Sequence, residues 1–349
     1  MIHQLSIDDF LLQSKGRLVL DVRSEGEFNY GHILNATSLP LFNNEERKIV
    51  GTSYKQQGKN EAILLGLDIV GKKMSEFVRF VQPLLKDNKV FVHCWRGGMR
   101  SGSMAWLLNL FGYEVYVLKG GYKAYRHHVL EGLAKKFNYI VIGGRTGSGK
   151  TKVLAELKQM GEQVVDLEAL ANHKGSAFGA LGQQKQPSTE HFENLLAEEL
   201  KKFDASRRVW LEDESKTIGR VFLDLNFWNH LRLAPVFAIE LPVETRVEKL
   251  IEEYGTFSAE ELKASFNNIE RRLGNEQWKN AIAAIEEKDL KKATEIALRY
   301  YDKAYDKGIA MKETKEVYRF AFQSDDISHI ADHLLTEADK ISTTNQSSV

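Results

Sequence analysis

A single cysteine, Cys94, lies in a segment that would make its sulfur reactive. The segment HCWRGGMRS, residues 93–101, connects an apolar stretch typical of a strand to a stretch typical of a helix. Backbone N–H groups in such a turn can point at the sulfur, and the start of the helix adds a positive end. Arg96 and Arg100 add fixed positive charge. Because each contribution favours thiolate over thiol, we expect a lowered pKa for Cys94 and a nucleophilic sulfur.

Two chemistries use such a loop. The two glycines, Gly97 and Gly98, let the backbone approach a bound anion closely. The pattern His-Cys-x5-Arg-Ser fits phosphatases whose thiolate attacks phosphorus while the arginine grips the phosphate. It also fits rhodaneses, whose cysteine carries sulfur or selenium. Since the chain has no second cysteine, a chalcogen bound to Cys94 must pass to an external acceptor.

An upstream segment separates these two chemistries. The sequence LDVRSEGEFNYGHILNATSLP, residues 20–40, resembles the N-terminal signature of the rhodanese family, with Gly-His-Ile and Ala-x-x-Leu-Pro at the family's spacing. Cysteine-dependent phosphatases do not need this element, so the rhodanese interpretation is favoured. The resemblance implies a transferase in which Cys94 is the nucleophile, assisted by Arg96, Arg100 and the loop amides.

A second loop is typical of diphosphate binding. The sequence GRTGSGKT, residues 144–151, matches G-x-x-x-x-G-K-[ST] directly after the apolar stretch YIVIG. In such a loop the backbone N–H groups hold a diphosphate, the lysine reaches the terminal phosphate and the threonine hydroxyl binds Mg²⁺. The residues expected to bind the ligand are Gly144, Gly147, Ser148, Gly149, Lys150 and Thr151.

The acidic partner of this loop is expected in RRVWLEDE, residues 207–214, where a short apolar strand ends in carboxylates. We expect Asp213, in preference to Glu212, to bind the diphosphate complex and to share the Mg²⁺ ion with Thr151. An ordinary strand end with solvated carboxylates would give the same pattern. The loop indicates diphosphate binding without specifying the ligand, which could be ATP, GTP or another diphosphate ester.

Alternating strands and helices must position these loops. Apolar runs at 17–22, 89–93 and 114–118 alternate with helical patterns, and the strand pattern restarts at 139–143. The expected fold class is α/β, with an N-terminal rhodanese-like parallel-sheet domain followed by a P-loop NTPase-like α/β domain with a helical C-terminal region. The expected domains are 1–136, 137–325, and a terminal helix with a disordered tail at 326–349, the disorder starting at Ser342.

Composition limits the protein class. Lys plus Arg and Asp plus Glu both total 48 among 349 residues, so net charge gives no global signal for nucleic acid. The start of the sequence lacks the pattern of a signal peptide, and no apolar run is long enough to cross a bilayer. We therefore expect a cytoplasmic protein without membrane contact. A lone cysteine excludes a Cys-based metal cluster.

The order of further segments resembles the tRNA 2-selenouridine synthase family from about residue 20 to residue 305. The most specific pieces are the cysteine loop and NHKGSAFG, residues 172–179, with VGTSYKQ, EDES and LRYYD in the family's order. A departure is Lys216-Thr217, where the family would have an arginine nearby.

That resemblance implies an enzyme that converts 2-thiouridine at the tRNA wobble position, in the anticodon arm, to 2-selenouridine with selenophosphate. It also implies an S-geranyl-2-thiouridine intermediate made from geranyl diphosphate, since an alkylated sulfur leaves more readily than a thiocarbonyl. The P-loop would then hold a diphosphate leaving group with Mg²⁺. The alternatives are a rhodanese–kinase fusion that moves sulfur and phosphorylates a small molecule, and a regulatory module that only senses nucleotides and anions.

Overall fold

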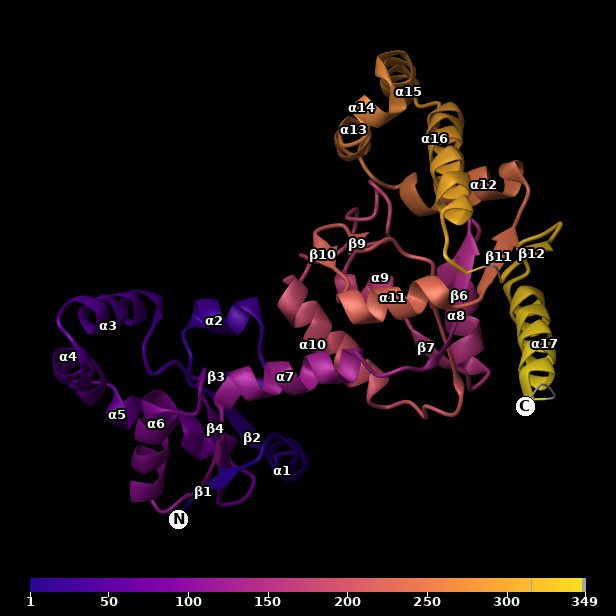
Figure 1. Cartoon of the computed structure of the whole chain (residues 1–349). Coiled ribbons are helices and arrows are strands. Elements are labelled where there is room, and N and C mark those ends of the chain that lie inside the picture. The colour runs from indigo at the N-terminus through magenta and orange to yellow at the C-terminus, as the bar shows by residue number, and fades with distance from the viewer. Residues whose placement is uncertain (315, 347–349) are drawn as a thin grey trace. The chain divides into compact units, whose positions relative to one another are not determined.

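The chain forms two compact units, each built around its own parallel sheet (Figure 1). The structure, a computed structural model, describes residues 1–314 and 316–346, and only the backbone for 342–346. The first unit comprises Met1–Gly132 with Glu193–Ala197, and the second comprises Leu133–Phe192 with Glu198–Val349. The division lies close to the boundary expected after residue 136, and the expected α/β class is confirmed.

The first unit contains a five-stranded sheet of order β1-β5-β4-β2-β3, in which every neighbouring pair is parallel. Its core consists of alternate strand residues packed against helices, with Leu20, Val90, Val92 and Met104 fully buried. The strands are β1 (Ile2–Leu5), β2 (Leu18–Asp21), β3 (Ala36–Ser38), β4 (Lys89–His93) and β5 (Glu114–Leu118). The helices are α1 (Ile7–Gln13), α2 (Glu25–Tyr30), α3 (Asn44–Gln56), α4 (Lys59–Gly71), α5 (Met74–Val81), the short 3-10 helix Gln82–Leu84, α6 (Met99–Leu110) and α7 (Gly121–Leu133).

The second unit repeats this plan with the sheet order β12-β11-β6-β8-β7, again parallel throughout. The central strand β6 ends at Gly144 and delivers the chain directly into the P-loop. The strands are β6 (Asn138–Gly144), β7 (Gln163–Val165), β8 (Arg208–Glu212), β11 (Val236–Glu240) and β12 (Val317–Ala321), with a separate antiparallel pair of β9 (Thr217–Ile218) and β10 (Val221–Phe222). The first helices of this unit are α8 (Lys150–Gln159), α9 (Leu167–Ala171), α10 (Thr189–Leu200) and α11 (Leu225–Leu233).

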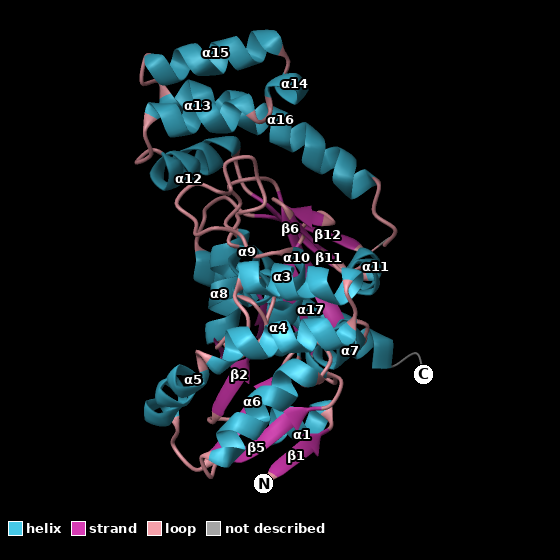
Figure 2. Cartoon of the chain, turned by 90° about the vertical axis from the view of Figure 1, so that its left-hand side faces the viewer, coloured by secondary structure: helices cyan, strands magenta, loops and turns pink. Residues whose placement is uncertain are grey.

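The helical region expected at 244–308 is present, and Figure 2 shows its helices gathered beyond one end of the second sheet. It comprises α12 (Val243–Tyr254), α13 (Ala259–Asn267), α14 (Glu270–Leu273), α15 (Asn275–Glu286) and α16 (Leu290–Ala310). These helices share a small apolar core of their own that includes Phe266, Ile285 and Ile296.

The terminal helix α17 (Ile327–Gln346) belongs to the core of the second unit, because Ile330, Leu334 and Ala338 are fully buried with residues of α8 and β6. The sequence predicts disorder from Ser342, whereas the helix continues to Gln346; residues 347–349 lie outside the described residues. Within residues 1–314 and 316–346, no helix is long and apolar enough to cross a membrane.

Candidate functional site

The cysteine loop lies at the carboxyl end of β4, where the turn between β5 and α7 packs directly against it. Gly97 has φ +67°, and a Cβ added there would lie 2.5 Å from the carbonyl oxygen of Leu118. A Cβ on Gly121, which has φ +60°, would lie 2.4 Å from the carbonyl oxygen of Cys94. The amide of Tyr122 donates to that same oxygen at 2.8 Å. Only glycine fits at either position, so the shape of the loop depends on this contact.

Hydrogen bonds make the buried sulfur of Cys94 acidic. Its Sγ lies 3.2 Å from the hydroxyl of Ser101, and only 3% of the residue is exposed. Burial raises the pKa of Cys94, but hydrogen bonds from the Ser101 hydroxyl and from the amides of Ser101, Arg96 and Gly98 outweigh it, so the pKa is lowered. The direction agrees with the expectation from sequence. The cause is mainly donated hydrogen bonds, rather than the arginine charges.

The two arginines of the loop differ in their surroundings. Arg100 binds Glu27 through two hydrogen bonds of 2.6 Å and 3.2 Å, whereas Arg96 is exposed. Burial raises the pKa of Glu27, and Arg100 more than compensates, so the pKa is lowered and the ion pair is maintained. Arg100 was expected to face an anion, but its guanidinium is already paired with a carboxylate of α2. Arg96 is therefore the better placed of the two to meet a ligand.

A buried ion pair explains the upstream signature. Arg23 is 1% exposed and binds Asp21 at 2.6 Å, and it also donates to the carbonyl oxygen of Gly31 at 2.7 Å. Its guanidinium stacks 3.7 Å from the ring centroid of Tyr122, the residue that binds Cys94 through its amide. The signature thus ties β2 and the segment after α2 to the cysteine loop. Burial lowers the pKa of the adjacent His93, which favours its neutral form.

The second loop has the conformation needed to surround a diphosphate. Gly144, Gly147 and Gly149 all have positive φ, and a Cβ on Gly144 would lie 2.5 Å from the hydroxyl oxygen of the buried Ser148. Lys150 begins α8 and donates through Nζ to the carbonyl oxygen of Gly144 at 3.1 Å, so it lies across the loop. The expected phosphate-binding residues are therefore gathered at one helix N-terminus.

A buried arginine that the sequence analysis did not identify supports this loop. Arg246 of α12 is 1% exposed, donates to the carbonyl oxygen of Thr146 at 3.1 Å, and binds Asp302 of α16 through two bonds of 2.8 Å. It therefore fastens the P-loop to the helical region. No local pattern marks it, because α12 contains several other charged residues.

The carboxylates near the P-loop are arranged differently from the expectation. Asp213 forms an ion pair with Lys312 at 2.5 Å, whereas Glu168 of α9 accepts a hydrogen bond from Thr151 at 3.2 Å. Burial and the neighbouring Glu168 raise the pKa of Glu214 to about 8. Glu168, which the sequence analysis did not identify, is thus the carboxylate that binds Thr151, and a shared Mg²⁺ site of Thr151 and Asp213 stays a prediction.

These oxygen atoms are the kind that Mg²⁺ prefers. In the part of the chain that the structure describes, no group of three or more His, Cys, Asp or Glu side chains forms a metal cluster. The hydroxyl of Thr151 and the carboxylates of Glu168 and Glu214 nevertheless suit a hard cation that takes its remaining ligands from phosphate and water. Glu168 and Glu214 are half-buried, and a divalent cation would relieve the repulsion between their two carboxylates.

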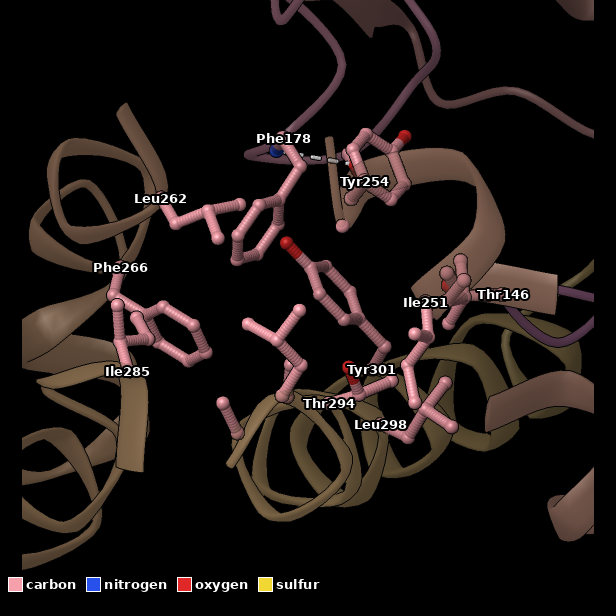
Figure 3. A pocket seen from close by; sticks show the side chains of 16 residues that line it. Thr146, Phe178, Ile251, Tyr254, Leu262, Phe266, Ile285, Thr294, Leu298 and Tyr301 are labelled. Atoms are coloured by element: carbon pink, nitrogen blue, oxygen red, sulfur yellow. Dashed lines mark hydrogen bonds between the residues drawn. The ribbon is translucent and has the colours of Figure 1, made fainter. Parts of the chain in front are cut away.

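An apolar pocket adjoins the P-loop at Thr146, with a cavity of about 60 Å³ (Figure 3). Helices α12, α13, α15 and α16 enclose it together with the segment around Phe178, and Tyr301 crosses it with its hydroxyl accepting from the amide of Ala177 at 3.0 Å. Its main apolar walls are Phe178, Leu262, Phe266, Ile285, Leu298 and Tyr301.

Three side chains of the kinds that commonly contact RNA have partners within the protein. Arg126 of α7 binds Glu193 and Asn194, and Lys174 pairs with Glu253. Tyr301 lines the apolar pocket instead of facing outward. The charge and spacing of these residues do not by themselves indicate an RNA surface.

Comparisons with known proteins cover both units. The model of the "tRNA 2-selenouridine synthase AAA domain" matches residues 137–338, and the model of the "Rhodanese-like domain" matches residues 8–128. A tRNA 2-selenouridine synthase of Sulfurovum sp. (strain NBC37-1) is 34% identical, over 86% of this chain and 91% of its own. One from Shewanella denitrificans is 33% identical, over 87% of this chain and 92% of its own. Among solved structures, a rhodanese-like domain protein from Staphylococcus aureus is 20% identical, covering 35% of this chain and 90% of its own, with a TM-score of 0.22.

Proposed function

The chain belongs to the tRNA 2-selenouridine synthase family, and on that basis we propose that it replaces the sulfur of 2-thiouridine in tRNA with selenium. The substrate position is the wobble uridine of the anticodon arm, the selenium donor is selenophosphate, and the reaction takes place in the cytoplasm. The nucleophile of this reaction is Cys94, whose pKa is lowered by the hydrogen bonds of its loop.

We further propose that the second unit prepares the base by transferring a geranyl group from geranyl diphosphate to its sulfur. The observation that carries this proposal is the apolar pocket at Thr146, because it places an apolar wall directly beside a diphosphate-binding loop. An isoprenoid chain gains free energy along its whole length from such a wall, which offers few groups to hydrogen-bond the polar edges of a nucleoside. A ten-carbon chain needs more room than this cavity has, so binding must move the aromatic side chains that line it.

In the transfer step, the loop amides and Lys150 bind the diphosphate and stabilise the charge that develops on it as the carbon–oxygen bond breaks. Thr151 and Glu168 would hold Mg²⁺, with the carboxylate of Glu214 as a further ligand. Asp213 would become a ligand only after its ion pair with Lys312 is broken. The metal, when bound, would neutralise part of the diphosphate charge. The sulfur of 2-thiouridine forms the new bond to carbon, and diphosphate is the leaving group.

In the selenation step, the thiolate of Cys94 attacks C2 of S-geranyl-2-thiouridine. A C2–S bond to the cysteine forms, the C2–S bond to the geranyl sulfur breaks, and geranyl thiolate leaves and takes a proton from water. Selenium of selenophosphate then attacks C2 and expels the cysteine thiolate, after which water cleaves the P–Se bond and releases phosphate. No atom changes oxidation state, whereas a perselenide on Cys94 would require an oxidant in addition to selenophosphate. Arg96 and the amides of Gly97 and Gly98 would bind the phosphate group of the donor.

The experiment that tests this function incubates the protein with a 2-thiouridine anticodon-arm RNA, geranyl diphosphate and selenophosphate, followed by mass spectrometry of the nucleosides. The wild type should yield 2-selenouridine. Cys94→Ala should accumulate S-geranyl-2-thiouridine, and Lys150→Ala should selenate only RNA that was geranylated in advance. Absence of both modified nucleosides in the wild type would refute the proposal. Loss of both steps in Cys94→Ala would show that they are not separable.

A further inference from the structure

The first unit contains a groove of about 990 Å³ between α3, α4 and α6, apart from the pocket beside the P-loop. Its floor is apolar, with the buried residues Phe42, Ala62, Gly66 and Met104. Small residues of α4 make this depth possible, since a Cβ on Gly66 would lie only 3.2 Å from the Phe42 ring. The volume falls within the range of small-molecule sites.

Large apolar side chains surround the groove without being covered. Leu67 is 62% exposed, Met99 58%, Trp106 56% and Tyr54 53%. Single exposed apolar side chains are common on protein surfaces, but several that line the same groove are typical of a binding site. The occupant must therefore be largely apolar.

One wall of the groove is the first turn of α6, which directly follows the cysteine loop in the sequence. Met99, Arg100, Gly102 and Ser103 line it, and the residue between them, Ser101, holds its hydroxyl 3.2 Å from the sulfur of Cys94. A ligand that fills the groove and extends past this turn would therefore present its other end near the sulfur.

The outer edge of the groove is basic. Arg47, Lys48 and Lys55 of α3 line it and are exposed. Cationic side chains around an apolar hollow complement an apolar group attached to a polyanion, because the chain fills the hollow and the phosphates meet the cations. A purely apolar ligand would gain nothing from these charges.

We propose that this groove binds the geranyl chain of S-geranyl-2-thiouridine tRNA during selenation and thereby places C2 of the base at Cys94. This inference rests on the proposed function. The geranyl chain would thus use two binding sites. The pocket at Thr146 holds it in geranyl diphosphate, and the groove holds it on the sulfur that leaves during selenation. The groove selects the alkylated base over the 2-thiouridine precursor, which has no chain to fill it.

The test uses the full-length protein, selenophosphate and two anticodon-arm RNAs that carry S-geranyl- or S-methyl-2-thiouridine. The wild type should prefer the geranyl substrate in kcat/KM. In the double variant Leu67→Gln/Trp106→Gln the preference should fall about tenfold, which corresponds to about 1.4 kcal/mol. Both residues are more than half exposed, so the fold should tolerate the change.

The matched control is Leu64→Gln/Leu110→Gln, on the same two helices, where Leu64 is 57% and Leu110 66% exposed and neither lines the groove. It should keep the wild-type preference. Geranylation of 2-thiouridine RNA by the groove variant should also remain at the wild-type rate, because that step uses the other unit.

An unchanged preference in the groove variant, while the wild type still selenates geranylated RNA, overturns the groove assignment and leaves the proposed function intact. A wild type that selenates neither RNA overturns both. If the groove variant loses its preference only together with a change in oligomeric state by size-exclusion chromatography, the groove belongs to a second copy of the chain and the assignment is wrong.

Discussion

The hydroxyl of Ser101 should control the reactivity of Cys94. The substitution Ser101→Ala removes a hydrogen bond of 3.2 Å to the sulfur, while the backbone amides that also stabilise the thiolate remain. Fewer hydrogen bonds then offset the effect of burial, which disfavours the thiolate, so the pKa of Cys94 should rise.

The size of the effect follows from the environment of the sulfur. A hydrogen bond to a charged group contributes about 1.5–3 kcal/mol, and a weak acceptor such as sulfur belongs at the lower end. With only 3% of Cys94 exposed, the sulfur has little contact with water that could compensate for the lost donor. A loss of about 1.5 kcal/mol lowers the thiolate population about tenfold at any pH below the pKa.

Alkylation measures this population directly, because the chain has one cysteine and intact-mass analysis then reports a single site. The rate of modification by iodoacetamide should be about tenfold lower in Ser101→Ala than in wild type at low pH, and the two rates should converge at high pH. Ser103→Ala, an exposed position on the same helix, is the control and should behave as wild type. Equal rates for Ser101→Ala and wild type across the pH range would refute the assignment of the hydroxyl as a thiolate donor.

Three further predictions concern the second unit. Arg246→Met should destabilise it by about 3 kcal/mol in urea unfolding, because Asp302 keeps a charge without its partner, whereas Arg319→Met at an exposed ion pair should cost no more than about 1 kcal/mol. Since burial raises the pKa of Glu214 to about 8, its protonated form stabilises the fold below the unfolded pKa, and this stability is lost as pH rises toward 8. Without divalent cations, the free energy of unfolding should therefore fall less in Glu214→Gln than in wild type between about pH 5 and about pH 8. An equal fall in both proteins would contradict the raised pKa of Glu214. Thr294→Phe, which fills the pocket, should raise KM for geranyl diphosphate more than KM for dimethylallyl diphosphate. An equal rise in both KM values would show that the isoprenoid chain binds outside this pocket.

Local patterns allowed the two loops and the strands that lead into them to be predicted. The cysteine loop and the P-loop are each defined by neighbouring residues, and β4, β5 and β6 are short apolar runs that bury both faces. Strand β1 was missed because it is a partly exposed edge strand whose sequence, IHQL, shows no apolar run.

The partners of the loop residues could not be predicted, because tertiary contacts bring them together. Glu27 is 73 positions from Arg100 in the sequence, and Arg246 is 100 positions from Thr146. The ion pair of Asp213 with Lys312 could not be predicted for the same reason, because the two residues are 99 positions apart, and the assignment of Asp213 to Mg²⁺ stays a prediction. Glu168 lies on α9, which follows β7, and no sequence pattern indicates that it contacts Thr151.

The close packing of Gly97 against Gly121 has a consequence for protein synthesis. The ribosome releases Cys94 before the turn that contains Gly121, so a growing chain holds the sulfur before the segment that shapes its loop has emerged. Until that turn docks, the amides are not arranged around the thiol, and the cysteine has the low nucleophilicity of an ordinary unfolded residue. Activation of the sulfur therefore requires that synthesis has passed this turn, so the reactive thiolate forms only when both segments can pack together.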